Sequence, residues 1–71
     1  MTRYLMVIEP TESGFSAYLP DVPGCVATGA TRAAVEADMR DAIEFHFDGL
    51  REEGYDVPEP RTDAAFLDVA A

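Results

Sequence analysis

The chain opens with two runs of apolar residues that predict β-strands. Residues 2–9 carry apolar side chains on both faces, a pattern typical of a strand in the middle of its sheet. Pro10 is expected to end this strand, because proline cannot donate to a ladder. Residues 15–19 alternate, with three apolar side chains on one face. Since only a short polar loop separates the two runs, we expect an antiparallel hairpin.

A third strand is expected over residues 25–30, after a turn at Pro23 and Gly24. Proline presets the first central φ of a type II turn, and glycine supplies the positive φ of the second. Gly29 is expected to mark a bulge or the end of this strand.

After residue 30 the apolar pattern changes from the period of a strand to that of a helix. Thr31 is a good helix N-cap, and Gly54 stands where a left-handed glycine closes a helix. The sequence therefore predicts a long helix that begins at Arg32 and packs one face against the sheet. The apolar stripe of this helix, with spacings of three and four, consists of Val35, Met39, Ala42, Ile43, Phe47 and Leu50.

The segment that follows the helix contains Pro58 and Pro60, which predict an extended connection. Weak alternation over residues 65–70 then predicts a short fourth strand. The predicted order is β-β-β-α-β, an α+β fold with a three-stranded antiparallel sheet, a fourth strand and one long helix on one face. A right-handed crossover would place the fourth strand parallel to the first.

Length and charge limit what the chain can do. Its 71 residues predict a single domain, residues 1–71, and a domain this small gains from forming a homo-oligomer, a dimer or a tetramer. Fourteen acidic and five basic residues give a net charge of −9. Phosphates are bound by basic side chains, so we expect no direct contact with nucleic acid, whereas a basic protein would be attracted.

Single reactive side chains offer little chemistry. Cys25 is the one cysteine and cannot form an internal disulfide, so we expect it to pack as a small apolar residue. His46 is the one histidine and is expected to serve packing. We expect no cofactor, no metal and no catalytic residue. The sequence shows neither a signal peptide nor an apolar run long enough to span a membrane, which favours a cytoplasmic protein with no membrane partner.

The many carboxylates leave one enzymatic alternative open. Glu9, Asp21, Glu44 and Asp68 could in principle gather around metal ions, as two-metal nucleases require. No local spacing fixes that geometry, and solvated surface acids are the simpler interpretation. Cleavage of RNA with Mg²⁺ or Mn²⁺ that disappears in Glu44→Gln or Asp68→Asn would identify such an enzyme.

The pattern of turns and helix resembles the HicB antitoxin family. The most specific part is the run from Pro20 to Cys25, and the match extends over roughly residues 3–60. The residues that carry it are Tyr4 to Glu9, Gly14 to Cys25, Ala27 to Gly29, Thr31, Asp41 to His46, Gly54, and Val57 to Pro60.

This resemblance implies a partial ribonuclease-H-like fold and a partner, the small basic RNA-cleaving toxin HicA, whose RNA-binding face the antitoxin would cover. Many relatives carry a C-terminal DNA-binding domain, for which these 71 residues leave no room, so autorepression is not expected. An orphan HicB-like regulatory or scaffold module remains an alternative to the antitoxin, as does the reduced metal-dependent nuclease.

If the partner contact follows charge, the acidic flank of the predicted helix is the candidate site. Asp41, Glu44, Asp48 and Glu52 recur at spacings of three and four and therefore share one flank. The alternative interpretation is a solvated helix face without a partner.

Overall fold

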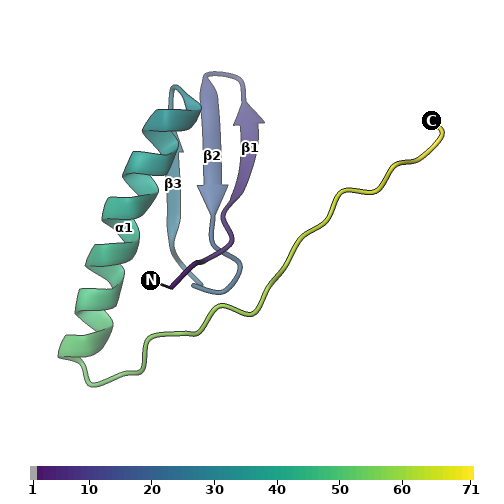
Figure 1. The fold of residues 1–71 in the computed structure, drawn as a ribbon. Helices are drawn as coiled ribbons and strands as arrows, with labels where there is room; N and C mark the ends of the chain where they lie inside the picture. Colours follow the sequence, from purple (N-terminus) through teal and green to yellow (C-terminus); the bar gives the residue numbers. More distant parts are fainter. Residues whose placement is uncertain (1) are drawn as a thin grey trace.

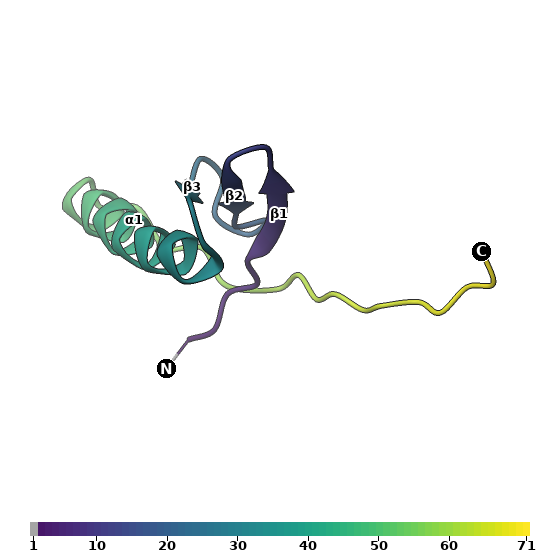
Figure 2. The same ribbon diagram turned by 90° about the horizontal axis from the view of Figure 1, so that it is seen from above.

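A computed structural model describes residues 2–71 and contains one sheet and one helix (Figure 1). The strands are β1 (Val7–Thr11), β2 (Gly14–Tyr18) and β3 (Val26–Gly29), and they are antiparallel in the order β1-β2-β3. The helix α1 (Arg32–Glu52) packs against β3 and β2 on one side of the sheet (Figure 2). The α+β class, the antiparallel sheet and the single long helix predicted from the sequence are confirmed.

The first hairpin forms as predicted, with shifted boundaries. Residues 2–6 lie outside the ladder because Val7 pairs with Tyr18, the last residue of β2. Pro10 does not end the strand, as was predicted, but pairs with Phe15 inside it. An edge strand tolerates this proline because the missing N–H can face away from the neighbouring strand.

The prediction that the first strand is central in the sheet is wrong for this structure. β1 pairs only with β2 and forms one edge, so β2 is the central strand. The apolar residues on both faces of β1 are consequently half-buried rather than buried, as for Val7 and Ile8.

The fourth strand predicted over residues 65–70 is not formed in this structure. After α1 the chain passes below the sheet and then projects away from it (Figures 1 and 2). Residues 65–71 are extended, and none of them forms a hydrogen bond with the remainder of residues 2–71. We call residues 64–71 the arm. Its departure from the sheet begins where the backbone of Arg61 and Thr62 is tied to Asp21.

Both ends of the helix follow the predicted signals. The Thr31 side chain accepts a hydrogen bond from the Ala34 N–H at 3.1 Å, as an N-cap does. Beyond the C-terminal end, Gly54 has a φ of +78°, the left-handed conformation that glycine adopts without steric cost. Gly24 likewise has a φ of +85°, as its place in the predicted turn requires.

No helix within residues 2–71 is both long and apolar enough to cross a membrane.

The core is small and lies between the sheet and the first half of α1. Val22 and Val35 are completely buried, although Val22 belongs to the loop between β2 and β3. That loop folds on itself through backbone hydrogen bonds, including Cys25 N–H to the Val22 carbonyl at 3.2 Å, so that Val22 points inwards. The buried apolar residues are Ala17, Leu19, Val22, Cys25, Ala27, Val35 and Met39.

The second half of α1 extends past the sheet, and Tyr4 fills part of the space beneath it. The Tyr4 ring lies 5.5 Å from the Phe47 ring, centroid to centroid, and its hydroxyl donates to the Pro58 carbonyl. Tyr4 therefore joins the start of the chain, the helix and the segment that follows it.

Replacing Gly29 by alanine is expected to destabilise the domain by about 1–3 kcal/mol, the cost of overpacking a tight contact. A Cβ at Gly29 would approach the Val35 nitrogen to 2.6 Å, because α1 crosses the end of β3 there. Gly49 offers a matched control, since a Cβ there meets nothing within 4 Å. Gly49→Ala should stabilise the helix by about 1 kcal/mol. Urea denaturation measures both changes, and equal effects would contradict this packing.

Candidate functional site

The four predicted partner-binding residues lie together on the exposed side of α1. Asp41, Glu44, Asp48 and Glu52 are all exposed to solvent. Their spacings of three, four and four residues place them on one stripe of the helix, opposite the buried Val35 and Met39. The structure therefore brings the predicted residues into one surface, while it does not test whether a partner binds there.

An exposed aromatic side chain borders this acidic stripe. Phe45 is 83% exposed and stands four residues after Asp41 and three before Asp48. We call Asp41, Glu44, Phe45, Asp48 and Glu52 the acidic face. A large exposed aromatic ring beside charged side chains is typical of protein interfaces, where aromatic anchors contribute much of the binding energy.

The negative charge of the acidic face is only slightly offset by neighbouring bases. Asp48 forms one exposed ion pair with Arg51, with an N–O distance of 3.6 Å. Arg51 also lies over the Phe47 ring, 5.9 Å from its centroid, which holds the guanidinium towards the core side of the helix. Such an exposed pair contributes little to stability, so Asp48 remains free to exchange Arg51 for a basic group on a partner.

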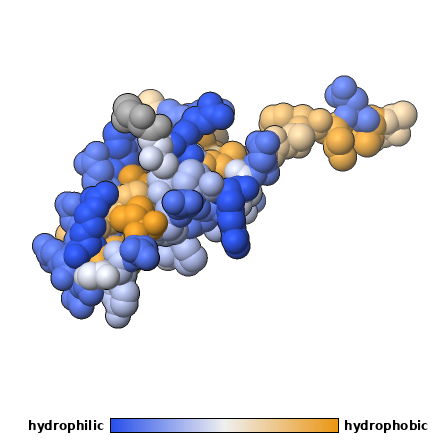
Figure 3. All heavy atoms as spheres, turned by 60° about the horizontal axis from the view of Figure 1, so that its bottom comes forward, coloured by the Kyte–Doolittle hydropathy of each residue, from blue (hydrophilic) through white to orange (hydrophobic). Residues whose placement is uncertain are grey.

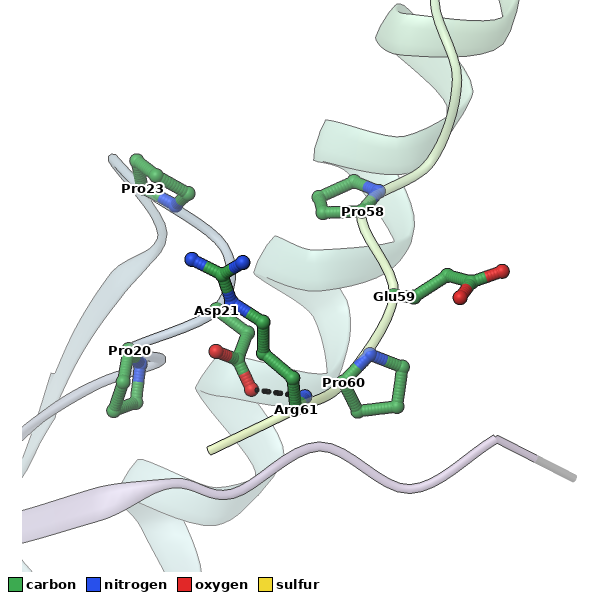
Figure 4. A pocket seen from close by; sticks show the side chains of 7 residues that line it. All are labelled: Pro20, Asp21, Pro23, Pro58, Glu59, Pro60 and Arg61. Carbon is green, nitrogen blue, oxygen red and sulfur yellow. Dashed lines mark hydrogen bonds between the residues drawn. The ribbon is translucent and has the colours of Figure 1, made fainter. Parts of the chain in front are cut away.

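A second polar cluster, which the sequence did not reveal, fixes the segment after the helix (Figure 4). One carboxylate oxygen of Asp21 accepts the backbone N–H groups of Arg61 at 2.9 Å and Thr62 at 2.8 Å. The other oxygen accepts the Thr62 hydroxyl. We call these three hydrogen bonds the clamp. They join residues about forty positions apart in the sequence, and no local pattern could have signalled them.

The clamp should open only at a pH below the ordinary pKa of an aspartate, 3.8. The Thr62 hydroxyl, followed by the N–H groups of Thr62 and Arg61, lowers the pKa of Asp21 below its ordinary value of 3.8. The clamp is therefore complete above the ordinary pKa and is lost as the pH falls through the lowered value. An NMR titration should show the Thr62 amide shifting with a midpoint below 3.8. A midpoint at or above that value, or an unchanged Thr62 shift in Asp21→Asn, would contradict the clamp.

The other candidate groups do not form a reaction centre. Glu9, Asp21, Glu44 and Asp68 lie on β1, the loop after β2, α1 and the arm. Within residues 2–71, no three acidic, histidine or cysteine side chains are grouped as a metal ion requires. These four residues are therefore not gathered around a metal site in this structure.

The cysteine and the histidine both take part in packing. Burial raises the pKa of the Cys25 thiol, whose sulfur lies 3.7 Å from the Met39 sulfur. A thiol with a raised pKa is a poor nucleophile at neutral pH. The ring of His46 is half-buried and lies 6.4 Å from the Phe47 ring, centroid to centroid.

Known proteins are similar to this chain in sequence and in fold. Residues 4–68 match a family model described as the HicB_like antitoxin of a bacterial toxin-antitoxin system. One chain of a solved HicA3 and HicB3 toxin-antitoxin complex is similar, with a TM-score of 0.72 and 35% identity over 84% of this chain and 70% of that chain. The crystal structure of antitoxin HicB3 gives the same TM-score and identity over 84% of this chain and 44% of that chain.

A phage protein is also similar in sequence. An uncharacterized 14.9 kDa protein in the rep-hol intergenic region of Haemophilus phage HP1 (strain HP1c1) is 34% identical over 56 residues, which are 79% of this chain and 42% of that protein. The chain therefore spans less than half the length of the phage protein and of the crystallised HicB3 chain.

Proposed function

Because the chain belongs to the HicB-like antitoxin family of bacterial toxin-antitoxin systems, we propose that it is an antitoxin that neutralises a HicA-type toxin. It would do so without catalysis, in the cytoplasm, by covering the RNA-binding and active face of a small basic RNA-cleaving protein. The similarity to a chain of the HicA3 and HicB3 complex supports this choice of partner.

The acidic face is the observation that carries the proposed mode of binding. A toxin that binds RNA must present basic side chains to phosphates. Four exposed carboxylates on one side of α1 offer a row of negative charge that competes for the same side chains. The exposed Phe45 beside this row supplies an apolar anchor, which an RNA backbone lacks.

The net charge favours this kind of partner. A chain with a net charge of −9 is steered towards a basic protein and away from nucleic acid. Encounter between the two proteins should accordingly be fast at low salt and slower at high salt, because salt screens exposed charges.

The proposed function is tested by measuring RNA cleavage by a HicA-type toxin from the same genome with and without this chain. Loss of cleavage at one equivalent of antitoxin site per toxin supports the proposal. Undiminished cleavage would favour the orphan regulatory or scaffold module.

A further inference from the structure

One face of the sheet carries apolar side chains that remain open to solvent within residues 2–71. α1 packs against the other face, where Ala17 and Ala27 are buried in the core (Figure 2). Successive side chains of a strand point to opposite faces of a sheet. Tyr18 and Val26, each one position from a buried alanine, therefore project from the open face, where they are 43% and 67% exposed.

The strand register joins these apolar side chains into one row across the sheet. Val7 pairs with Tyr18, and Tyr18 pairs with Val26. Residues that are directly opposite each other carry their side chains on the same face, with Cβ atoms about 5 Å apart. The row therefore crosses all three strands and has a tyrosine at its centre. We call Val7, Tyr18 and Val26 the sheet row.

The sheet row differs from the exposed apolar side chains of the arm. Phe66, Leu67 and Val69 belong to the arm, which stands clear of the body (Figure 3). The sheet row lies on paired strands, so its three side chains are held in place by the ladder. A partner that binds a preformed surface does not have to order it, which favours binding.

The polar side chains beside the sheet row are acidic or neutral. Glu9 pairs with Ser16, and Ser16 pairs with Thr28, so these three form the next row on the same face. The three strands contain no basic residue. The open face thus combines an apolar row with a polar border that would not repel a basic protein.

Asp38 connects the open face with the acidic face of α1. Its carboxylate accepts the Thr28 backbone N–H at 3.4 Å, so this flank of α1 reaches the outer edge of β3. Asp38 precedes Asp41 of the acidic face by three residues, a spacing that makes them neighbours on a helix. Thr28 in turn stands two residues after Val26, on the same face of β3. The acidic face and the sheet row are therefore joined around the edge of β3.

On the basis of the proposed function, we propose that a HicA-type toxin bound at the acidic face also covers the sheet row, with Tyr18 as the central anchor. A stable protein interface takes about 20–30 residues a side, more than the acidic face supplies. Interfaces place aromatic and apolar side chains at their centre and charged groups at their rim. The sheet row supplies such a centre, and the acidic face supplies the charged rim.

The two parts of this surface should act on different rate constants. Attraction between the acidic face and a basic toxin works at a distance and raises the association rate. Apolar contacts form only after the proteins meet, so the sheet row should slow dissociation instead. Its contribution should also persist at high salt, because salt screens charges and does not weaken apolar contacts.

Stopped-flow kinetics of the full chain with a HicA-type toxin test the sheet row. The double variant Tyr18→Ser/Val26→Ser should raise the dissociation rate at least about 30-fold and change the association rate less than about twofold. Val26→Ser alone should raise the dissociation rate at least about 5-fold, and it provides the test if the double variant does not fold. Tyr55→Ser is the matched control, because Tyr55 is 66% exposed beyond the end of α1, and it should leave both rates unchanged.

The possible outcomes distinguish the sheet row from the proposed function. Circular dichroism first establishes that each variant is folded. If the native chain binds the toxin and folded Val26→Ser dissociates at the native rate, the sheet row is not in contact with the toxin and the proposal is overturned, while the proposed function stands. A slower association with unchanged dissociation would also overturn the proposal. A native chain that does not bind the toxin would overturn both.

Discussion

Reversing the charge of the acidic face should weaken binding of a HicA-type toxin by at least about 100-fold, or about 3 kcal/mol. The change is the quadruple variant Asp41→Lys/Glu44→Lys/Asp48→Lys/Glu52→Lys. Each substitution replaces an exposed carboxylate that would meet a basic group with a charge that repels it. Lysine is a good helix former, so α1 should persist. Isothermal titration calorimetry with the toxin measures the loss.

A second quadruple variant distinguishes the contribution of the acidic face to binding from the contribution of the net charge. Glu9, Glu12, Asp56 and Glu59 are exposed acids outside α1, and replacing them by lysine changes the net charge by the same amount, from −9 to −1, since −9 + 8 = −1. The control should lower the association rate but retain most of the affinity. Equal loss in the two variants would show that net charge, and not the acidic face, determines binding.

The largest effect on stability is expected for Val22→Asp. Val22 is completely buried in the loop between β2 and β3, and within residues 2–71 the core around it contains no buried polar or charged residue. An unpaired buried charge costs several kcal/mol, against a total stability of about 4–10 kcal/mol for a domain of this length. The variant should be largely unfolded at 25 °C, as measured by far-UV circular dichroism and urea denaturation.

Val26→Asp is the matched control for Val22→Asp. Val26 lies on β3, only four residues away, but it is 67% exposed. The same change in chemistry should therefore cost less than about 1 kcal/mol, as surface substitutions do. If both variants unfolded alike, Val22 could not be the buried core residue that the structure describes.

The parts of the fold that could be predicted are those fixed by local chemistry. Thr31 and Gly54 mark the ends of α1 because capping depends on neighbouring backbone groups. The hairpin of β1 and β2 follows from alternation and a short polar loop. The acidic face could be predicted as a helix stripe because residues three and four apart in a helix are neighbours.

The parts that escaped prediction depend on residues distant in the sequence. Asp21 was one of many acids until the structure placed it against Arg61 and Thr62. The sequence pattern of residues 65–70 is that of a strand, but a strand forms only beside an edge, and the clamp leads the arm away from its own sheet. Because this fourth strand does not pair with β1 in the structure, β1 lies at the edge of the sheet and not in its middle, as was predicted.

The most direct test of the antitoxin function is a titration of RNA cleavage. A HicA-type toxin from the same genome is incubated with labelled RNA and increasing amounts of this chain, at low salt. The proposed function predicts that cleavage falls linearly to zero at a fixed stoichiometry and returns when the charge-reversed acidic face replaces the native one. Cleavage that continues unchanged at a large excess of the native chain would contradict it.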